Sequence, residues 1–182
     1  RNVKQIMKYL ISSKNEGIQY KWDGSADYKL TAYCDSDFAG DVETRKSTTG
    51  YVIYFCGGPI SWCSRKQPIV SLSSTEAEYI AAADCVKELL FLKSLIEELI
   101  NTKVSKTLNV DNQSAIQLMK SGQFNRRSKH IDVRFHFLCE KVREGVLEVK
   151  YCPTNNQIAD IFTKALGKQK FNVFKELLLC KI

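Results

Sequence analysis

The chain has 182 residues, of which 44% are hydrophobic and 26% charged, so we expect one globular domain with a sizeable core rather than a disordered chain. No apolar run reaches membrane-spanning length and nothing at the start resembles a signal peptide, so we expect no membrane contact. The 27 Lys and Arg residues outnumber the 20 Asp and Glu residues, and this net charge of +7 favours a polyanionic partner such as nucleic acid, although solubility alone would also explain it.

Seven cysteines are scattered along the chain without a Cys-x-x-Cys pair. This odd count favours a reduced, intracellular compartment over a disulfide framework or a zinc site. The chain begins at Arg1 rather than at Met, which suggests a piece excised from a longer polypeptide.

The first 25 residues are interpreted as the tail of a preceding domain. Apolar residues at helical spacing predict an amphipathic helix over residues 1–13. Residues 18–22 are typical of a short strand, and a turn connects them to a second strand over residues 30–35.

This second strand ends at two carboxylates, Asp35 and Asp37, in the stretch YCDSDFAG. An aspartate at a strand end has a rigid base and an open side, which metal-dependent phosphoryl chemistry requires. Aspartate is also an ordinary turn former in this position. The residue type alone therefore leaves both interpretations open.

Two further strands follow a polar loop that carries Arg45 and Lys46. β-Branched and aromatic residues predict strands over residues 50–56 and 60–64, with a Gly-Gly-Pro turn between them. Residues 30–64 are therefore expected to form an antiparallel meander.

A long helix is predicted from the SLSSTEAEY stretch to about residue 100. Ser73 and Glu76 have the spacing of a capping box, and Thr75 offers a second cap for Glu78. Glu78 then lies in the first turn or so of a long buried helix. For Glu76 we favour the simpler role of complementing the helix dipole.

The second half of the chain alternates strands and helices. The strand over residues 107–110 ends at a third aspartate, Asp111, and the helix over residues 155–166 carries a fourth, Asp160. The remaining predicted elements are helices over residues 113–120, 133–144 and 168–180 and a strand over residues 146–152.

The order of elements predicts an α/β fold with a five-stranded mixed sheet, three antiparallel strands followed by two parallel ones, and helices on both faces. Function in such sheets gathers at the carboxyl ends of the parallel strands, where Asp35 and Asp111 are expected. Glu78 can lean over the same edge, and Asp160 comes from the last helix of this unit. Four crowded carboxylates repel unless a cation binds them, and oxygen ligands select Mg²⁺ or Mn²⁺.

Six ordered motifs resemble the ribonuclease H domain of Pol polyproteins from copia-type LTR retrotransposons. The resemblance is dense from residue 1 to residue 166. The motifs are YCDSDFAGD, RKSTTGY at 45–51, SLSSTEAEY at 71–79, VDNQSAI at 110–116, RSKHID at 127–132 and NNQIADIFTK at 155–164.

The resemblance implies a ribonuclease H-like fold and a metal-dependent endonuclease. Such an enzyme cuts the RNA strand of RNA–DNA hybrids during reverse transcription and leaves a 3′-hydroxyl and a 5′-phosphate. The implied catalytic residues and metal ligands are Asp35, Glu78, Asp111 and Asp160, holding two ions in an in-line mechanism with a metal-bound water as nucleophile. Asp37 is kept as a turn residue or a support for Asp35.

Hybrid recognition is expected to use short polar groups beside the carboxylates and basic loops farther out. The minor-groove candidates are Ser74, Thr75, Asn112 and Gln113, and the phosphate-contacting candidates are Arg45, Lys46, Arg126, Arg127 and Lys129. His130 follows the basic loop and is a further candidate, although packing or capping is the favoured role.

Cellular members of the family often carry a mobile histidine a few residues before the last aspartate. This chain has Tyr-Cys-Pro-Thr-Asn-Asn there, so the residue for product release or proton shuttling is unassigned. A zinc site made of His130, His136 and Cys139 has the wrong spacing and too few ligands.

The resemblance also implies a context. Residues 1–25 would connect a reverse transcriptase domain, the expected protein partner, to the ribonuclease H domain at 26–166, with a helical extension at 167–182. The expected location is a cytoplasmic retrotransposon particle. Two alternatives are a hybrid-binding clamp with little activity alone and a DNA transposase or integrase of the same fold; the early position of Glu78 disfavours the last.

Overall fold

The computed structural model describes residues 2–21, 24, 28–122 and 129–181, with only the backbone of residues 2 and 129–135. Its centre is a five-stranded sheet with strand order β4-β3-β2-β5-β6. The first three strands are antiparallel neighbours: β2 (Lys29–Asp37), β3 (Thr48–Phe55) and β4 (Gly58–Lys66). Strands β5 (Ser105–Val110) and β6 (Glu148–Tyr151) run parallel to β2. The predicted mixed sheet is confirmed.

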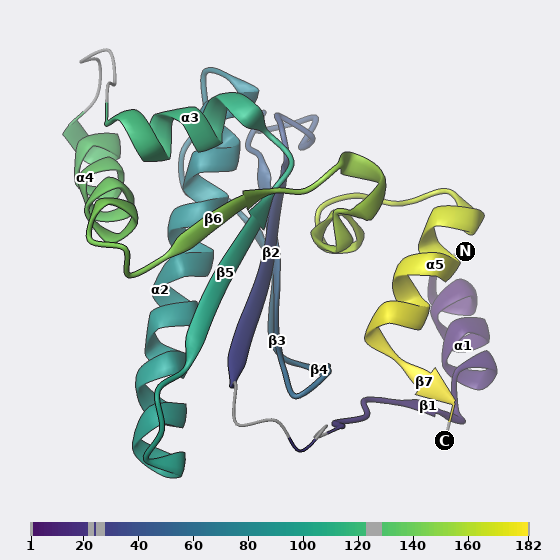
Figure 1. Cartoon of the computed structure of the whole chain (residues 1–182). Helices are drawn as coiled ribbons and strands as arrows, with labels where there is room; N and C mark the ends of the chain where they lie inside the picture. The colour runs from purple at the N-terminus through teal and green to yellow at the C-terminus, as the bar shows by residue number, and fades with distance from the viewer. Residues whose placement is uncertain (1, 22–23, 25–27, 123–128, 182) are drawn as a thin grey trace.

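One face of the sheet is covered by α2 (Ser74–Ile100), with α3 (Gln113–Ser121) and α4 (Lys129–Arg143) beside it (Figure 1). The start of α2 follows the predicted capping pattern. The Ser73 side chain accepts a hydrogen bond from the Glu76 backbone N–H, and the Glu76 carboxylate accepts one from the Leu72 N–H at 2.9 Å. These bonds satisfy the Glu76 donor in the first turn and the Leu72 donor just before the helix, and so fix where α2 begins.

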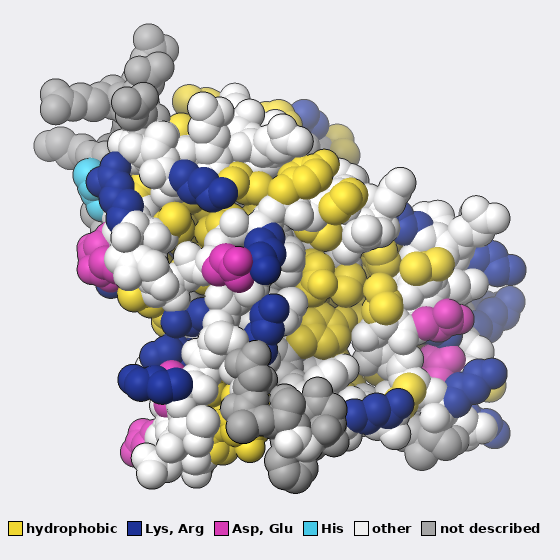
Figure 2. All heavy atoms as spheres, in the orientation of Figure 1, with side chains coloured by type: hydrophobic (Ala, Val, Ile, Leu, Met, Phe, Trp, Pro, Cys, Tyr) yellow, Lys and Arg dark blue, Asp and Glu magenta, His cyan; other side chains and the backbone are white. Residues whose placement is uncertain are grey.

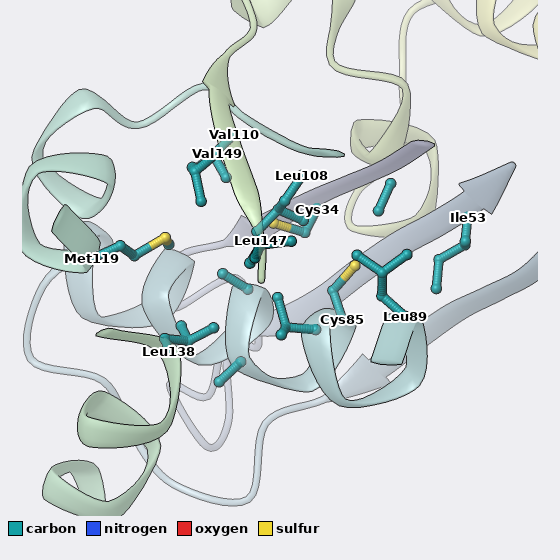
Figure 3. Close-up of a cluster of buried hydrophobic side chains, with 14 of the residues drawn as sticks. Cys34, Ile53, Cys85, Leu89, Leu108, Val110, Met119, Leu138, Leu147 and Val149 are labelled. Carbon is teal, nitrogen blue, oxygen red and sulfur yellow. The ribbon is translucent and has the colours of Figure 1, made fainter. Parts of the chain in front are cut away.

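The main core lies between α2 and the sheet (Figure 3). Alternate residues of β2, Leu30, Ala32 and Cys34, have no exposed surface, because successive strand side chains point to opposite faces. Small side chains at Ala82 and Ala83 let α2 approach the strands closely. Figure 3 shows side chains from the strands and from the three helices meeting in this cluster, among them Ile53, Leu89, Leu108, Met119, Leu138 and Val149.

The other face carries two short 3₁₀ turns, η1 (Thr154–Asn156) and η2 (Ile158–Phe162), and helix α5 (Lys168–Leu178). A smaller cluster of Val52, Ile158 and Phe174 joins them to β3. The prediction of one helix over residues 155–166 was wrong.

Gln157 interrupts that predicted helix with an extended backbone, and its fully buried side chain is used elsewhere. The side-chain amide donates to the Cys34 carbonyl at 2.9 Å and to the Asn109 carbonyl at 3.4 Å. Gln157 thereby fastens the segment that carries Asp160 to the two central strands.

The first and last segments of the chain meet beside the sheet (Figure 1). Helix α1 (Asn2–Ser12) lies against α5 through the Tyr9 and Phe171 rings, whose centroids are 6.1 Å apart. Strand β1 (Glu16–Gly17) pairs antiparallel with β7 (Cys180–Lys181). In the described part of the predicted strand at 18–22 no strand forms, and β1 lies just before it. No helix among the described residues is long and apolar enough to span a membrane.

Gly50 decides how closely η2 approaches the sheet. It lies opposite Asp35 in the β2–β3 register, and a Cβ atom there would be 2.5 Å from Thr163 Cγ2 and 2.8 Å from the Ala159 carbonyl oxygen. These distances are shorter than any ordinary contact, and the second partner is backbone. A side chain at position 50 is therefore incompatible with this packing of η2.

We predict that Gly50→Ala lowers the free energy of unfolding by roughly 1–3 kcal/mol, because the methyl group overpacks the β3–η2 contact. Urea denaturation monitored by circular dichroism measures this change. Gly167→Ala is the matched control, since no atom lies within 4 Å of its Cβ position and its φ is −61°. Equal stability loss in the two variants would contradict the interpretation of Gly50.

Candidate metal centre

Three carboxylates converge at the carboxyl edge of the parallel strands. Asp35 stands near the end of β2, Asp111 directly follows β5, and Glu78 comes from the first turns of α2. One oxygen from each of the three lies within 4.8 Å of the others. Neighbouring parallel strands bring their carboxyl ends together, and the capped start of α2 adds the third group. We call Asp35, Glu78 and Asp111 the acidic triad.

Glu78 presents one satisfied and one unsatisfied oxygen. Its Oε1 accepts hydrogen bonds from the Ser36 backbone N–H at 3.1 Å and from the Ser36 hydroxyl at 3.2 Å. Its Oε2 is buried, and no described residue forms a hydrogen bond with it. Burial, followed by the negative charges of Asp35 and Asp111, raises the pKa of Glu78. A buried carboxylate oxygen without a donor indicates a place for a cation.

Asp35 is buried and is oriented by Thr163, whose hydroxyl donates to Asp35 Oδ2 at 2.7 Å. Burial and a hydrogen bond with Asp160 raise the pKa of Asp35 to about 6, although the Thr163 hydroxyl acts in the opposite direction. Asp111 is more open, and its Oδ2 accepts a hydrogen bond from the Thr154 hydroxyl at 2.8 Å. The triad therefore has one side toward solvent.

Asp160 lies outside the triad grouping but touches it through Asp35. It is fully buried on η2, with Lys164 Nζ 2.8 Å from its Oδ1 and Lys170 Nζ donating to its Oδ2. Burial raises the pKa of Asp160, but hydrogen bonds with Asp35 and the two lysines outweigh burial and lower it. Asp160 is therefore held as an ionised carboxylate by cations of this same chain.

The donor set fits a hard divalent cation. The three carboxylates have oxygens within 4.8 Å of one another, and the Glu78 Oε2 atom has no hydrogen-bond partner among the described residues. Carboxylate oxygens are the ligands that Mg²⁺ and Mn²⁺ prefer. Asp37 is not part of this group; its carboxylate lies against Gly40, where a Cβ atom would be 1.8 Å from Asp37 Oδ2. That position is consistent with the turn role expected for Asp37.

The four minor-groove candidates lie at the starts of α2 and α3. Ser74 is exposed and Thr75 half-buried in the first turn of α2. Asn112 caps α3 by accepting a hydrogen bond from the Ala115 N–H at 2.9 Å, and Gln113 is the exposed first residue of that helix.

The basic candidates are only partly described. Arg45 is exposed and Lys46 half-buried in the loop between β2 and β3. Arg126 and Arg127 lie outside the described residues, as do the side chains of Lys129 and His130. On the face drawn in Figure 2, Lys and Arg side chains are spread over several elements. The net positive charge therefore does not mark one binding surface on that face.

Residues that orient the carboxylates were missed by sequence reasoning. Ser36, Thr154 and Thr163 each hydrogen-bond one triad member, and Lys164 and Lys170 pair with Asp160. Ser36 and Thr163 lie within the quoted motifs, beside or near an acid, and this proximity was a usable signal. Lys170 lies outside every motif, and only the packing of α5 brings it to the site.

Comparison with known proteins identifies relatives over nearly the whole chain. No protein-family model matches. The chain is 43% identical over 175 residues to the retrovirus-related Pol polyprotein from transposon TNT 1-94 of Nicotiana tabacum, covering 96% of this chain and 13% of that protein. It is 39% identical over 173 residues to the Pol polyprotein from transposon RE1 of Arabidopsis thaliana, covering 94% and 12%. The chain thus spans about an eighth of the length of these relatives.

Solved structures with a similar fold are ribonucleases H. The LC11 ribonuclease H1, isolated from compost, aligns with a TM-score of 0.53 at 19% identity, over 74% of this chain and 92% of its own. The same enzyme in complex with an RNA/DNA hybrid aligns with a TM-score of 0.53 at 17% identity, over 74% and 93%. These comparisons confirm the expected ribonuclease H-like fold.

We predict that Asp35→Asn stabilises the metal-free protein at neutral pH. The folded-state pKa of about 6 exceeds the ordinary value of 3.8, so the stability present below pH 4 is lost as pH rises through 6. The variant does not ionise at this position and should gain on the order of 1–3 kcal/mol at pH 7.5, with a much smaller gain at pH 4. Thermal melts in EDTA at both pH values measure the difference. A variant that is less stable than the native chain at pH 7.5 would contradict this account of Asp35.

Proposed function

We propose that this chain is a ribonuclease H, because it is a homologue of the Pol polyproteins of copia-type transposons and has the ribonuclease H fold. Its substrate would be the RNA strand of an RNA–DNA hybrid formed during reverse transcription. The observation that carries the proposal is the acidic triad, with the unpartnered Glu78 Oε2, at the carboxyl edge of this particular sheet.

Asp35, Glu78 and Asp111 would hold divalent metal, with Asp160 completing the set. Two bound Mg²⁺ or Mn²⁺ ions would supply an activated water and stabilise the leaving oxygen of an in-line displacement, giving a 3′-hydroxyl and a 5′-phosphate. Ser36 and Thr163 would keep the Glu78 and Asp35 carboxylates in fixed orientations, since each donates a hydrogen bond to one carboxylate oxygen.

The surroundings of the triad are suited to a hybrid. The minor groove of a hybrid displays 2′-hydroxyls on one strand only, and short polar side chains can read them. Ser74, Thr75, Asn112 and Gln113 are such groups, on two helix starts that flank the triad. Phosphates would be contacted by Arg45 and Lys46 in the β2–β3 loop and by Arg126, Arg127 and Lys129, with His130 beside them as a further candidate.

The homology to polyproteins suggests a larger assembly. Residues 1–25 would lead from a reverse transcriptase domain, residues 26–166 would be the ribonuclease H domain, and residues 167–182 an extension of it. The contact of α1 with α5 supports treating the two end segments as one layer on this domain. The domain would act inside a cytoplasmic retrotransposon particle.

We predict that Glu78→Gln reduces hybrid cleavage at least about a hundredfold, because the loss of one ligand charge weakens metal binding and charge stabilisation. The assay follows labelled RNA in an RNA–DNA hybrid with the purified 1–182 chain in Mg²⁺. Glu76→Gln is the matched control, because Glu76 lies two residues away and uses its carboxylate to cap Leu72, a bond that glutamine can keep. Undiminished cleavage by Glu78→Gln would overturn the site assignment.

We predict that Asp111→Asn abolishes cleavage while leaving hybrid binding within about threefold of the native chain, since the change removes one carboxylate charge and none of the Lys and Arg side chains proposed to contact phosphates. Binding is measured by fluorescence anisotropy in Ca²⁺, and cleavage in Mg²⁺. A native chain that binds the hybrid but does not cut it would support the clamp alternative, and cutting of duplex DNA would support a transposase.

A further inference from the structure

Two lysines form ion pairs with Asp160, the fourth carboxylate of the site. Lys164 Nζ lies 2.8 Å from Asp160 Oδ1, and Lys170 Nζ donates to Oδ2, so each oxygen of Asp160 has its own ammonium partner. The carboxylate is 1% exposed, whereas the two lysine side chains are 42% and 30% exposed. The two partly exposed lysines therefore more than balance the charge of this buried carboxylate before any ion enters the site.

Lys170 is built into the site from a distant element. It lies on α5, where its ammonium group is 5.2 Å from the centroid of the buried Phe174 ring, and it also donates to the Thr154 carbonyl at 3.2 Å. Thr154 in turn donates its hydroxyl to Asp111 at 2.8 Å. One lysine of the carboxyl-terminal helix is therefore linked to two of the four acids, to Asp160 directly and to Asp111 through Thr154.

The charges of the site match one divalent ion. Four carboxylates with two ammonium groups carry a formal charge of −2. Among the described residues, Glu78 Oε2 and Asp160 Oδ1 are both buried without a hydrogen bond, but Asp160 Oδ1 has the Lys164 ammonium 2.8 Å away and Glu78 Oε2 has no such ion pair. A first ion at the triad can bind the triad's carboxylate oxygens without displacing a lysine. A second ion that uses Asp160 meets two positive charges within ion-pair distance and requires at least one to leave.

We propose that Lys170 is a resident cation that controls the second metal position: it holds Asp160 until a second divalent ion replaces it. This inference rests on the proposed function and deepens it. After the Lys170 ammonium group leaves Asp160, it can form an ion pair with a phosphodiester of the bound hybrid, because lysine pairs readily with phosphate oxygens. Occupancy of the second position would then follow substrate binding, so the free protein holds one ion.

The test is calorimetric titration of Mn²⁺ into the 1–182 chain without nucleic acid. The native chain should bind one ion at the triad and a second only weakly. Lys170→Met keeps the length of the side chain but removes its charge, and should tighten the second site on the order of tenfold or more. Lys175→Met is the matched control on the same helix, since Lys175 pairs with Glu16 at 2.7 Å instead.

A double variant at Asp160 and Lys170 and the NMR signal of the Lys170 ammonium group test the same proposal independently. Asp160→Asn combined with Lys170→Met should cancel the gain, because the carboxylate that the second ion would use is gone. In the native chain, the NMR signal of the Lys170 ammonium should move with the second Mg²⁺ and not with the first. Unchanged second-site affinity in Lys170→Met, or a signal that does not move, overturns the inference; absence of any divalent binding overturns the proposed function instead.

Discussion

The mutual repulsion of three crowded carboxylates, two of them buried, is the constraint around which this molecule is organised. Asp35, Glu78 and Asp111 approach within 4.8 Å, and burial together with their neighbours raises the pKa of Asp35 and of Glu78. A chain would not keep this arrangement for stability, since each ionised group opposes its neighbours. The capped start of α2, the parallel pairing of β2 with β5 and the bond from Thr163 all hold these groups together against that repulsion.

The sheet and the triad could be predicted because their signals are local. Asp35 and Asp111 mark the ends of two strands in the sequence itself. The spacing of Ser73 and Glu76 marks the start of α2. A five-stranded mixed sheet, with the fourth and fifth strands parallel to the first, follows from the alternation of element types.

What could not be predicted depends on contacts between distant residues. The 155–166 segment has the composition of a helix, but the Gln157 side chain finds its partners on Cys34 and Asn109, and these bonds break the helix into two turns. Strands β1 and β7 have two residues each, too few for a periodic pattern to reveal. The partnership of Lys170 with Asp160 likewise needs the position of α5, which no spacing in the sequence encodes.

The pairing of β1 with β7 joins the first and last segments of the chain. Glu16 lies opposite Lys181, and the two ends of the chain lie on the same side of the molecule (Figure 1). The start of α1 lies at the opposite end of that helix from the β1–β7 pair, so the two ends are separated by the length of α1 (Figure 1). The pairing does make the first and last described segments depend on each other, because removal of either strand leaves the backbone groups of the other without their partner.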